Sequence, residues 1–252
     1  MPSSSAPASA RCSKRSRALA SFAVIGGGEA GVLYVRQLLR AAAAGRLGVE
    51  RIVVVDRDPR CAAAGLAPDA RVTLAVAEWA DWLDARLDAL PPGAHLVPYH
   101  WAPHLLREWL ERQVCCRGGR AERGGMVPSQ GVPWERELAS GDRALSYATW
   151  VCPPTCIEPA VCPHTRGPKD WSLAGELARR RPQDDAERVV FRALHLAYGV
   201  GTIPVSEILT ARDRLLSGRG VRTYLVATAS HCHGLAAALN VEGGSLDVAE
   251  AP

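Results

Sequence analysis

Short apolar runs alternate with helical patterns through the first half of the chain. The runs are rich in β-branched residues and short enough to be buried strands. The expected strands are Phe22–Ile25, Arg51–Val55, Val72–Val76 and His95–Tyr99. Between and after these runs, apolar residues recur three or four positions apart, as on one face of a helix. The expected helices are Ala30–Ala44, a segment carrying Trp79, Trp82, Leu83 and Leu87, and Pro103–Gln113. The alternation predicts an α/β fold with a mostly parallel sheet and crossover helices.

The alternation stops in the middle of the chain. Cys115–Asp142 contains six glycines and little periodicity, so residues 114–150 are expected to form a glycine-rich connector. The Cys/Pro-rich stretch that follows leaves little room for regular structure. Order is then expected to return as two strands and a helix, over Arg188–Leu196, Thr223–Thr228 and Pro204–Leu216. The chain therefore divides into an α/β domain (21–113), the connector, and a cysteine-rich part (151–245) that packs on the same sheet.

The composition is that of a folded protein. Of 252 residues, 48% are hydrophobic and 22% are charged, which excludes disorder as the main state. No apolar run approaches the roughly 20 residues that a membrane-spanning helix requires. The formal net charge of +4 is too small to indicate a nucleic-acid partner. We therefore expect a soluble protein that binds neither a membrane nor nucleic acid.

The first 20 residues differ in character from the rest. They are rich in serine and alanine and carry four basic residues, and no acidic residue precedes Glu29. Such a segment buries too little apolar surface to order itself. Residues 1–20 are thus expected to be a disordered basic tail, with an organelle-targeting peptide as the alternative.

A glycine-rich turn joins the first expected strand to the first expected helix. Gly26, Gly28 and Gly31 have the spacing G-x-G-x-x-G, in the strand–turn–helix context that this motif requires. The first glycine permits the tight turn, the second lets a phosphate approach the backbone, and the third lets the helix pack closely on the sheet. Asp56 ends the second expected strand, where its carboxylate can accept hydrogen bonds from both ribose hydroxyls. These four residues are the expected nucleotide site, and a turn needed only for packing is the alternative.

Residues 21–109 resemble two families of nucleotide-binding domains. The glycines and Asp56 resemble the NAD(P)-binding Rossmann domains, including the regulatory domains of potassium-uptake systems. The glycines with Glu29, and Asp56 with Asp58, also resemble class I methyltransferases and spermidine synthases, which implies an S-adenosylmethionine site. No acidic residue directly precedes the glycines, in contrast to many methyltransferases. The first resemblance implies a Rossmann-like sheet that binds NAD(P), in which Asp56 favours NAD and Arg57 leaves NADP open.

Three of the eight cysteines cluster in one loop, namely Cys152, Cys156 and Cys162. Eight cysteines are too dilute for a disulfide scaffold, and no signal-peptide core precedes them, which favours a reducing cytoplasm and thiols that act as ligands. Three thiolates this close suit one soft metal, and metal binding would supply the folding energy that a proline-rich loop lacks. Zinc needs a fourth ligand, for which His164 is nearest and Cys232 is the distant option. An iron–sulfur cluster and three free thiols are the alternatives.

A second set of reactive side chains follows the last expected strand. His231, Cys232 and His233 stand at its carboxyl end, where open α/β sheets place their ligands. Two imidazoles beside a thiol could lower the pKa of that thiol and create a nucleophile, so these three are the expected catalytic residues. Completion of the metal shell and a plain hairpin turn are the alternatives.

Together these features predict a nucleotide-binding protein, an NAD(P)-dependent oxidoreductase with a cysteine-bound metal. Such an enzyme needs a proton donor near the nicotinamide, for which His100 and His104 are further candidates. The alternatives are methyl or aminopropyl transfer from S-adenosylmethionine and a non-catalytic nucleotide-sensing domain. The partner is a small-molecule substrate that the sequence does not name, and a homo-oligomer stays open.

Overall fold

The structure is a computed structural model that describes residues 19–66, 68–99, 102–179, 185–196 and 198–243. The expected basic tail lies outside these residues, apart from Leu19 and Ala20, which open the first strand. His100 also lies outside them. No helix in these ranges is long and apolar enough to cross a membrane.

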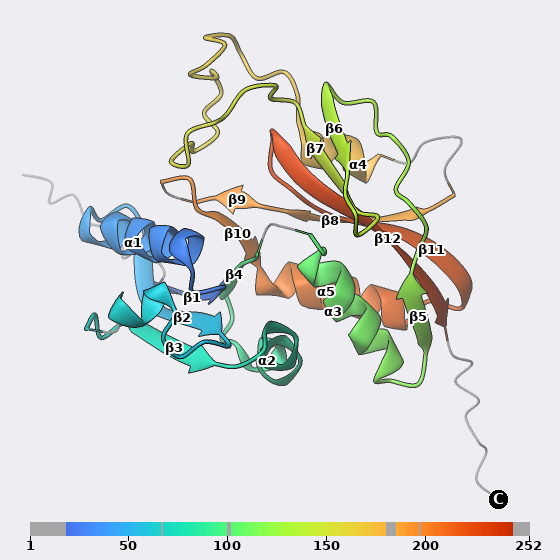
Figure 1. The fold of residues 1–252 in the computed structure, drawn as a ribbon, viewed down its shortest axis with the longest axis horizontal. Coiled ribbons are helices and arrows are strands. Elements are labelled where there is room, and N and C mark those ends of the chain that lie inside the picture. Colours follow the sequence, from blue (N-terminus) through green and yellow to red (C-terminus); the bar gives the residue numbers. More distant parts are fainter. Residues whose placement is uncertain (1–18, 67, 100–101, 180–184, 197, 244–252) are drawn as a thin grey trace, which may run out of the picture.

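Four parallel strands form the first half of the fold (Figure 1). They lie in the order β3-β2-β1-β4 and comprise β1 (Leu19–Ile25), β2 (Gly48–Asp56), β3 (Val72–Val76) and β4 (His95–Val97). All four expected strands are present, the fourth as the shorter His95–Val97. The apolar runs of β1, β2 and β4 are largely buried, whereas β3 lies at the edge of the sheet and fully buries only Val72. Two antiparallel strands then extend this sheet, β10 (Gly201–Pro204) on β4 and β9 (Leu194–His195) on β10. The first sheet is therefore mixed.

The helices of this half follow the sequence pattern closely. They are α1 (Glu29–Ala43), α2 (Trp79–Arg86) and α3 (Leu105–Cys115), with short 3-10 helices η1 (Ala62–Leu66) and η2 (Leu87–Ala89). The third helix starts two residues later than expected, because His104 caps it and Pro103 stays outside. The helical periodicity thus located the elements, and capping set their ends.

A second mixed sheet contains most of the remaining chain. Its order is β6-β7-β12-β11-β8, with β5 also paired to β12. The strands are β5 (Arg120–Arg123), β6 (Trp134–Glu137), β7 (Arg143–Ser146), β8 (Glu187–Arg192), β11 (Gly220–Ala229) and β12 (His233–Gly243). Two helices accompany it, α4 (Leu173–Ala178) and α5 (Val205–Leu216). Antiparallel pairs predominate in this sheet, and only β8 and β11 run parallel.

Two expectations need correction here. The chain does not form one mostly parallel sheet onto which residues 151–245 pack, because among the described residues of that part only β9 and β10 join the first sheet. The connector is not a loop throughout, since β5, β6 and β7 lie within residues 114–150. Four-residue strands with mostly polar side chains carry no hydrophobic periodicity, and backbone pairing with long-range partners is what orders them.

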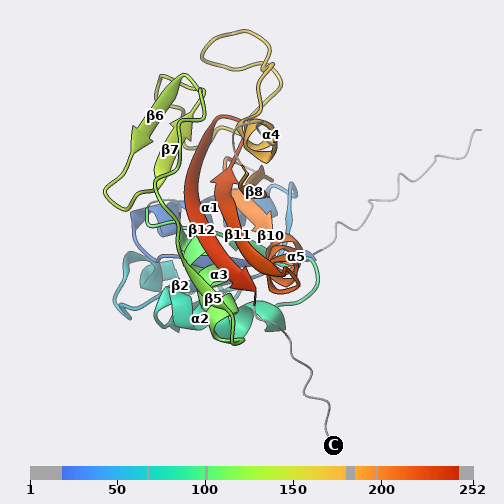
Figure 2. The ribbon, with the colours of Figure 1, turned by 90° about the vertical axis from the view of Figure 1, so that its right-hand side faces the viewer.

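The largest hydrophobic cluster lies between the two sheets. It joins Ile25 and Leu96 of the first sheet to Trp109 of α3 and to Tyr224 and Val226 of the second sheet. Figures 1 and 2 show α3 and α5 against the second sheet, while smaller clusters under α1 and α4 cover the outer faces. Full burial of each large apolar side chain contributes about 1.5–3 kcal/mol. The two halves therefore share one core and are held in a fixed relation.

Gly31 allows α1 to approach the first sheet closely. A Cβ at this position would lie 2.0 Å from the carbonyl oxygen of Gly26, which is backbone and cannot yield easily. Gly26 itself has φ +95°, a conformation that favours glycine. The first and third glycines of the turn are thus required by the fold alone.

We predict that Gly31→Ala destabilises the protein. Alanine in a helix is favoured over glycine by about 1 kcal/mol, but the clash with the Gly26 carbonyl group outweighs this gain, so we expect a net loss of about 1–3 kcal/mol in the free energy of unfolding. Chemical denaturation measures it. Gly125→Ala is the control, because a Cβ there meets nothing within 4 Å. An unchanged or raised stability of Gly31→Ala would contradict the close approach.

Candidate functional site

The glycine turn and Asp56 meet at the carboxyl ends of β1 and β2. The N–H of Gly27 donates to Oδ2 of Asp56 at 2.6 Å, and the N–H of Asp58 donates to Oδ1 at 2.9 Å. The N–H of Gly26 donates to the carbonyl oxygen of Val55 at 2.9 Å. The structure therefore brings together the four residues expected to bind a nucleotide, with the carboxylate held beside the turn.

Open space surrounds only the second glycine of the motif. A Cβ on Gly28 would meet nothing within 4 Å, whereas one on Gly27 would lie 2.4 Å from the sulfur of Cys61. Gly28 is exposed and caps α1 without a side-chain hydrogen bond. Its φ of −72° is accessible to any residue, so backbone strain does not explain the glycine. A helix N-terminus with this opening is suited to an anionic group.

A cavity of about 560 Å³ lies next to the turn, between the two halves of the molecule. Tyr99 belongs to both places, because it lines the cavity and its ring lies 3.7 Å from the Cβ position of Gly26. The walls come from α1, the end of β4, the start of α3, the cysteine loop and the β11–β12 turn. Polar groups on them include His104, Cys152, Cys156, Glu158, His195, Ser230, Cys232 and His233.

The expected catalytic trio divides between the cavity and the surface around it. Cys232 and His233 line the cavity, and His231 does not. His231 lies 3.0 Å from a guanidinium nitrogen of Arg192, and its backbone N–H donates to Glu158. Burial raises the pKa of the Cys232 thiol. This shift favours the protonated thiol and opposes the nucleophilic role that the neighbouring histidines suggested.

The cysteines of the loop lie near one another and near Cys232. Cys152 and Cys156 line the cavity together with Cys232, and Cys162 is buried in the same loop. Burial, followed by the neighbouring thiols, raises the pKa of Cys152. Two sulfurs accept backbone hydrogen bonds, from Glu158 N–H to Cys156 at 3.4 Å and from Thr165 N–H to Cys162. The second bond lowers the pKa of Cys162.

His164 stands apart from this group. It is exposed, and its ring stacks on Trp150 with the centroids 4.5 Å apart and the planes at 7°. Cys232, rather than His164, is the candidate fourth ligand that shares the cavity wall with Cys152 and Cys156. In the described parts of the chain, no three or more His, Cys, Asp and Glu side chains are gathered into a ready-made metal site.

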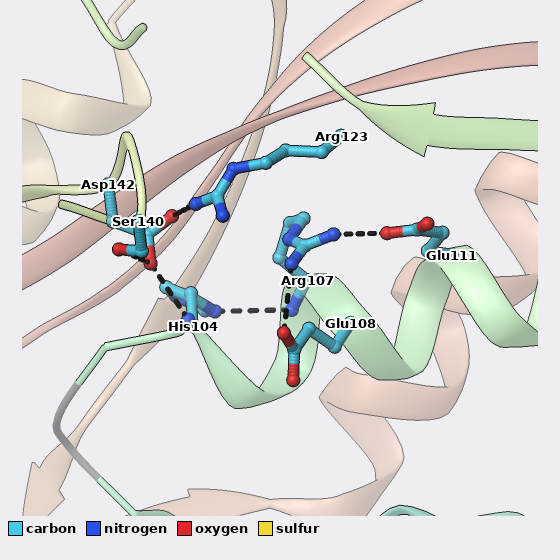
Figure 3. A network of polar contacts seen from close by, with 7 residues as sticks. All are labelled: His104, Arg107, Glu108, Glu111, Arg123, Ser140 and Asp142. Carbon is cyan, nitrogen blue, oxygen red and sulfur yellow. Dashed lines mark hydrogen bonds and ion pairs between the residues drawn. The ribbon is translucent and has the colours of Figure 1, made fainter. Parts of the chain in front are cut away.

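A buried polar network supports the start of α3 at the cavity wall (Figure 3). The backbone N–H of His104 donates to Asp142 at 3.0 Å, and Asp142 also accepts hydrogen bonds from Ser140 and Arg123. The ring Nδ1 of His104 accepts the backbone N–H of Arg107 at 3.1 Å. Burial lowers the pKa of His104 to about 4 from 6.5. His104 is therefore neutral at pH 7 and cannot supply the proton for which the sequence made it a candidate.

The sequence did not single out three other residues at the cavity. Glu158 and His195 line it, and Nδ1 of His195 lies 2.8 Å from the carbonyl oxygen of Cys156. Tyr99 closes the edge beside the glycines. None stands at a motif spacing, since Glu158 comes from the cysteine loop, His195 from β9 and Tyr99 from the segment after β4. For Glu158, the available signal in the sequence is its place between two Cys-Pro pairs, Cys152-Pro153 and Cys162-Pro163.

The comparisons with known proteins concern the C-terminal part. Residues 105–242 match the model of the AF_1314_C family, described as an uncharacterized protein, C-terminal domain. No curated protein and no solved structure matches the chain. The matched region starts at α3 and includes the cysteine loop and the β11–β12 turn, while the glycine turn precedes it. Because the match covers more than half of its residues, the chain belongs to the AF_1314_C family.

Proposed function

We propose that the protein binds NAD(P) through the glycine turn and acts as an NAD(P)-dependent oxidoreductase, with the nicotinamide end of the dinucleotide in the cavity. The observation that carries this proposal is the continuity of the two sites. The open Gly28 and the carboxylate of Asp56 lie at one end, and the cavity begins beside the same turn at Tyr99. A dinucleotide is elongated, so that one end can lie at the glycine turn while the other lies in the cavity.

The strand order supports the proposal. In open α/β sheets, ligands bind at the carboxyl ends of strands where the strand order reverses. The order β3-β2-β1-β4 has this reversal at β1, and both the turn and the cavity lie at the carboxyl ends of these strands. This arrangement of the first four strands favours a Rossmann-like nucleotide domain, to which the second sheet adds the remaining cavity wall.

Each part of the dinucleotide has a matching group in the protein. The N-terminus of α1 faces a pyrophosphate across Gly28, and Asp56 accepts hydrogen bonds from ribose hydroxyls. The carboxylate of Asp56 disfavours a 2′-phosphate, so NAD is preferred over NADP. When bound, the nicotinamide supplies a hydride acceptor or donor. The cavity residues that can exchange a proton with a substrate include Glu158, His195 and His233.

We further propose that the cysteine loop holds one metal ion, with Cys152, Cys156, Cys162 and Cys232 as ligands. The neighbouring thiols add to the raised pKa of Cys152, because thiolates repel one another. A cation would relieve this repulsion, which supports the metal site. The N–H···S hydrogen bonds to Cys156 and Cys162 stabilise thiolates in the same way. Within the described residues these thiols are not gathered into a ready-made site, so metal binding would draw the loop together. Four thiolates suit zinc, with an iron–sulfur cluster as the alternative.

We predict that the protein binds NAD and that Gly28→Ala weakens this binding at least tenfold. The added methyl group meets no protein atom within 4 Å, so stability should fall by no more than about 1 kcal/mol, but it occupies the space that the pyrophosphate needs. Calorimetry with NAD, NADP and S-adenosylmethionine, each up to about a millimolar, measures the affinities. Gly125→Ala is the matched control.

Each other outcome of this experiment selects a different function. Binding of S-adenosylmethionine alone would favour a transferase. Tight NAD binding without turnover of any carbonyl or alcohol substrate would favour a nucleotide sensor. If wild-type protein binds none of the three ligands, or if Gly28→Ala binds as well as wild type, the turn serves packing only.

We predict about one zinc ion per chain in protein purified without chelators, as a single tetrahedral site implies. Serine in place of Cys152, Cys156, Cys162 or Cys232 should abolish or strongly reduce the metal content, whereas His164→Asn should retain it. Cys115→Ser and Cys116→Ser are controls, because these exposed thiols lie outside the cavity. Elemental analysis measures the metal. Iron with acid-labile sulfide would indicate a cluster, and metal-free wild-type protein would show that the thiols are free.

A further inference from the structure

The orientation of the His104 ring is fixed by its hydrogen bonds. It is the N-cap residue of α3, and its Nδ1 accepts the N–H of Arg107, three residues into the helix (Figure 3). From the other side, its backbone N–H is held by the fully buried carboxylate of Asp142. Cap and carboxylate together fix both the backbone and the ring.

The cap also fixes the tautomer. A nitrogen that accepts a hydrogen bond carries no proton, so the proton of the neutral imidazole must lie on Nε2. The residue is 2% exposed, and this burial lowers its pKa to about 4. Arg107 acts in the same direction as burial, while Asp142 acts against it and does not reverse the shift. His104 is thus a neutral Nε2–H donor throughout the physiological pH range.

This donor has no acceptor within the described residues. Nε2 is buried and makes no hydrogen bond there, although nearly all buried polar atoms in proteins are paired. His104 is also one of the residues that line the cavity, where the start of α3 meets the cysteine loop and Tyr99. Most neighbouring cavity groups are apolar, among them Leu105, Leu106, Val97 and Leu33. In this apolar part of the wall, a donor of fixed orientation is typical of a group that fixes the orientation of a ligand.

We infer that His104 donates a hydrogen bond from Nε2–H to a carbonyl oxygen of the ligand in the cavity, which is the carboxamide oxygen of nicotinamide. The identity of this oxygen rests on the proposed function, in which the nicotinamide end enters the cavity. A neutral donor suits a carbonyl oxygen, which carries no full charge. An anionic group would gain more from a protonated imidazole, which the burial of His104 excludes.

The state of the ring is tested first, in the wild-type protein without ligand. Nitrogen-15 spectra of the histidine rings should show His104 with a protonated Nε2 and a bare Nδ1, unchanged between about pH 5 and pH 8. A proton on Nδ1, or a titration within this range, would overturn the inference. Addition of NAD should shift the Nε2–H resonance, and addition of ADP-ribose, which lacks the nicotinamide, should not. This test requires no variant.

The second test compares ligands in His104→Asn. The amide oxygen of asparagine can replace Nδ1 as the cap of α3, but the shorter side chain leaves the Nε2 position empty. We expect the affinity for NAD to fall about threefold to tenfold, the value of one neutral hydrogen bond, with the affinity for ADP-ribose unchanged. His164→Asn is the matched control, because this exposed histidine does not line the cavity.

The outcomes separate this inference from the proposed function. If wild type binds NAD and His104→Asn binds it equally well, His104 does not contact the ligand, and the proposed function stands. An equal loss of NAD and ADP-ribose affinity would show a general disturbance of the site and overturn the specific contact. If wild type binds neither ligand, the proposed function and the assigned oxygen both fail.

Discussion

Helix α3 is packed between the two sheets, and the rest of the structure depends on this contact. Trp109 is 1% exposed and lies in one cluster with Leu96 of the first sheet and Tyr224 of the second. Surface ion pairs such as Arg112 with Asp81 contribute little by comparison, because exposed pairs are worth about 0–1 kcal/mol. The buried apolar contacts therefore set the spacing of the sheets. That spacing leaves the cavity open at the start of the helix.

Buried hydrogen bonds add to the apolar packing that holds α3 in place. A carboxylate as deeply buried as that of Asp142 is costly unless it is hydrogen-bonded, and it accepts bonds from Arg123, Ser140 and the backbone of His104. Asp142 lies just before β7, so these bonds connect the second sheet to the first turn of α3. The wall of the cavity is thus fixed from both halves. The backbone and the ring of His104 are therefore held in one orientation at this wall.

Sequence reasoning located those elements whose residues carry their own signal. The apolar runs at β1 to β4 and the periodicity of α1 are sufficient, because burial on both faces of β1 and on one face of α1 requires such residues, and the edge strand β3 keeps a β-branched run. The sequence does not predict the long strand β12, since its first residue, His233, belongs to the expected reactive turn and its alanines give weak strand propensity. The strand forms because its backbone pairs with β11, β7 and β5. Its pairing with β11 is a local hairpin, in which Ala229 pairs with Gly234, but its pairing with β7 and β5 joins residues more than 80 apart, such as Leu235 and Ala144, which no local window contains.

In the candidate site, too, some residues carry a local sequence signal and others depend on long-range contacts. The glycine spacing and Asp56 are local enough to be read along the chain, and the structure places them together. The cysteine loop could be recognised, but the choice between His164 and Cys232 depends on a stacking contact with Trp150 and on a hairpin turn far along the chain. His104 was visible only as a histidine after a proline. Its tautomer follows from the cap, its neutrality from burial, and its contact with the cavity from the packing of α3, so each step toward its role required the folded structure.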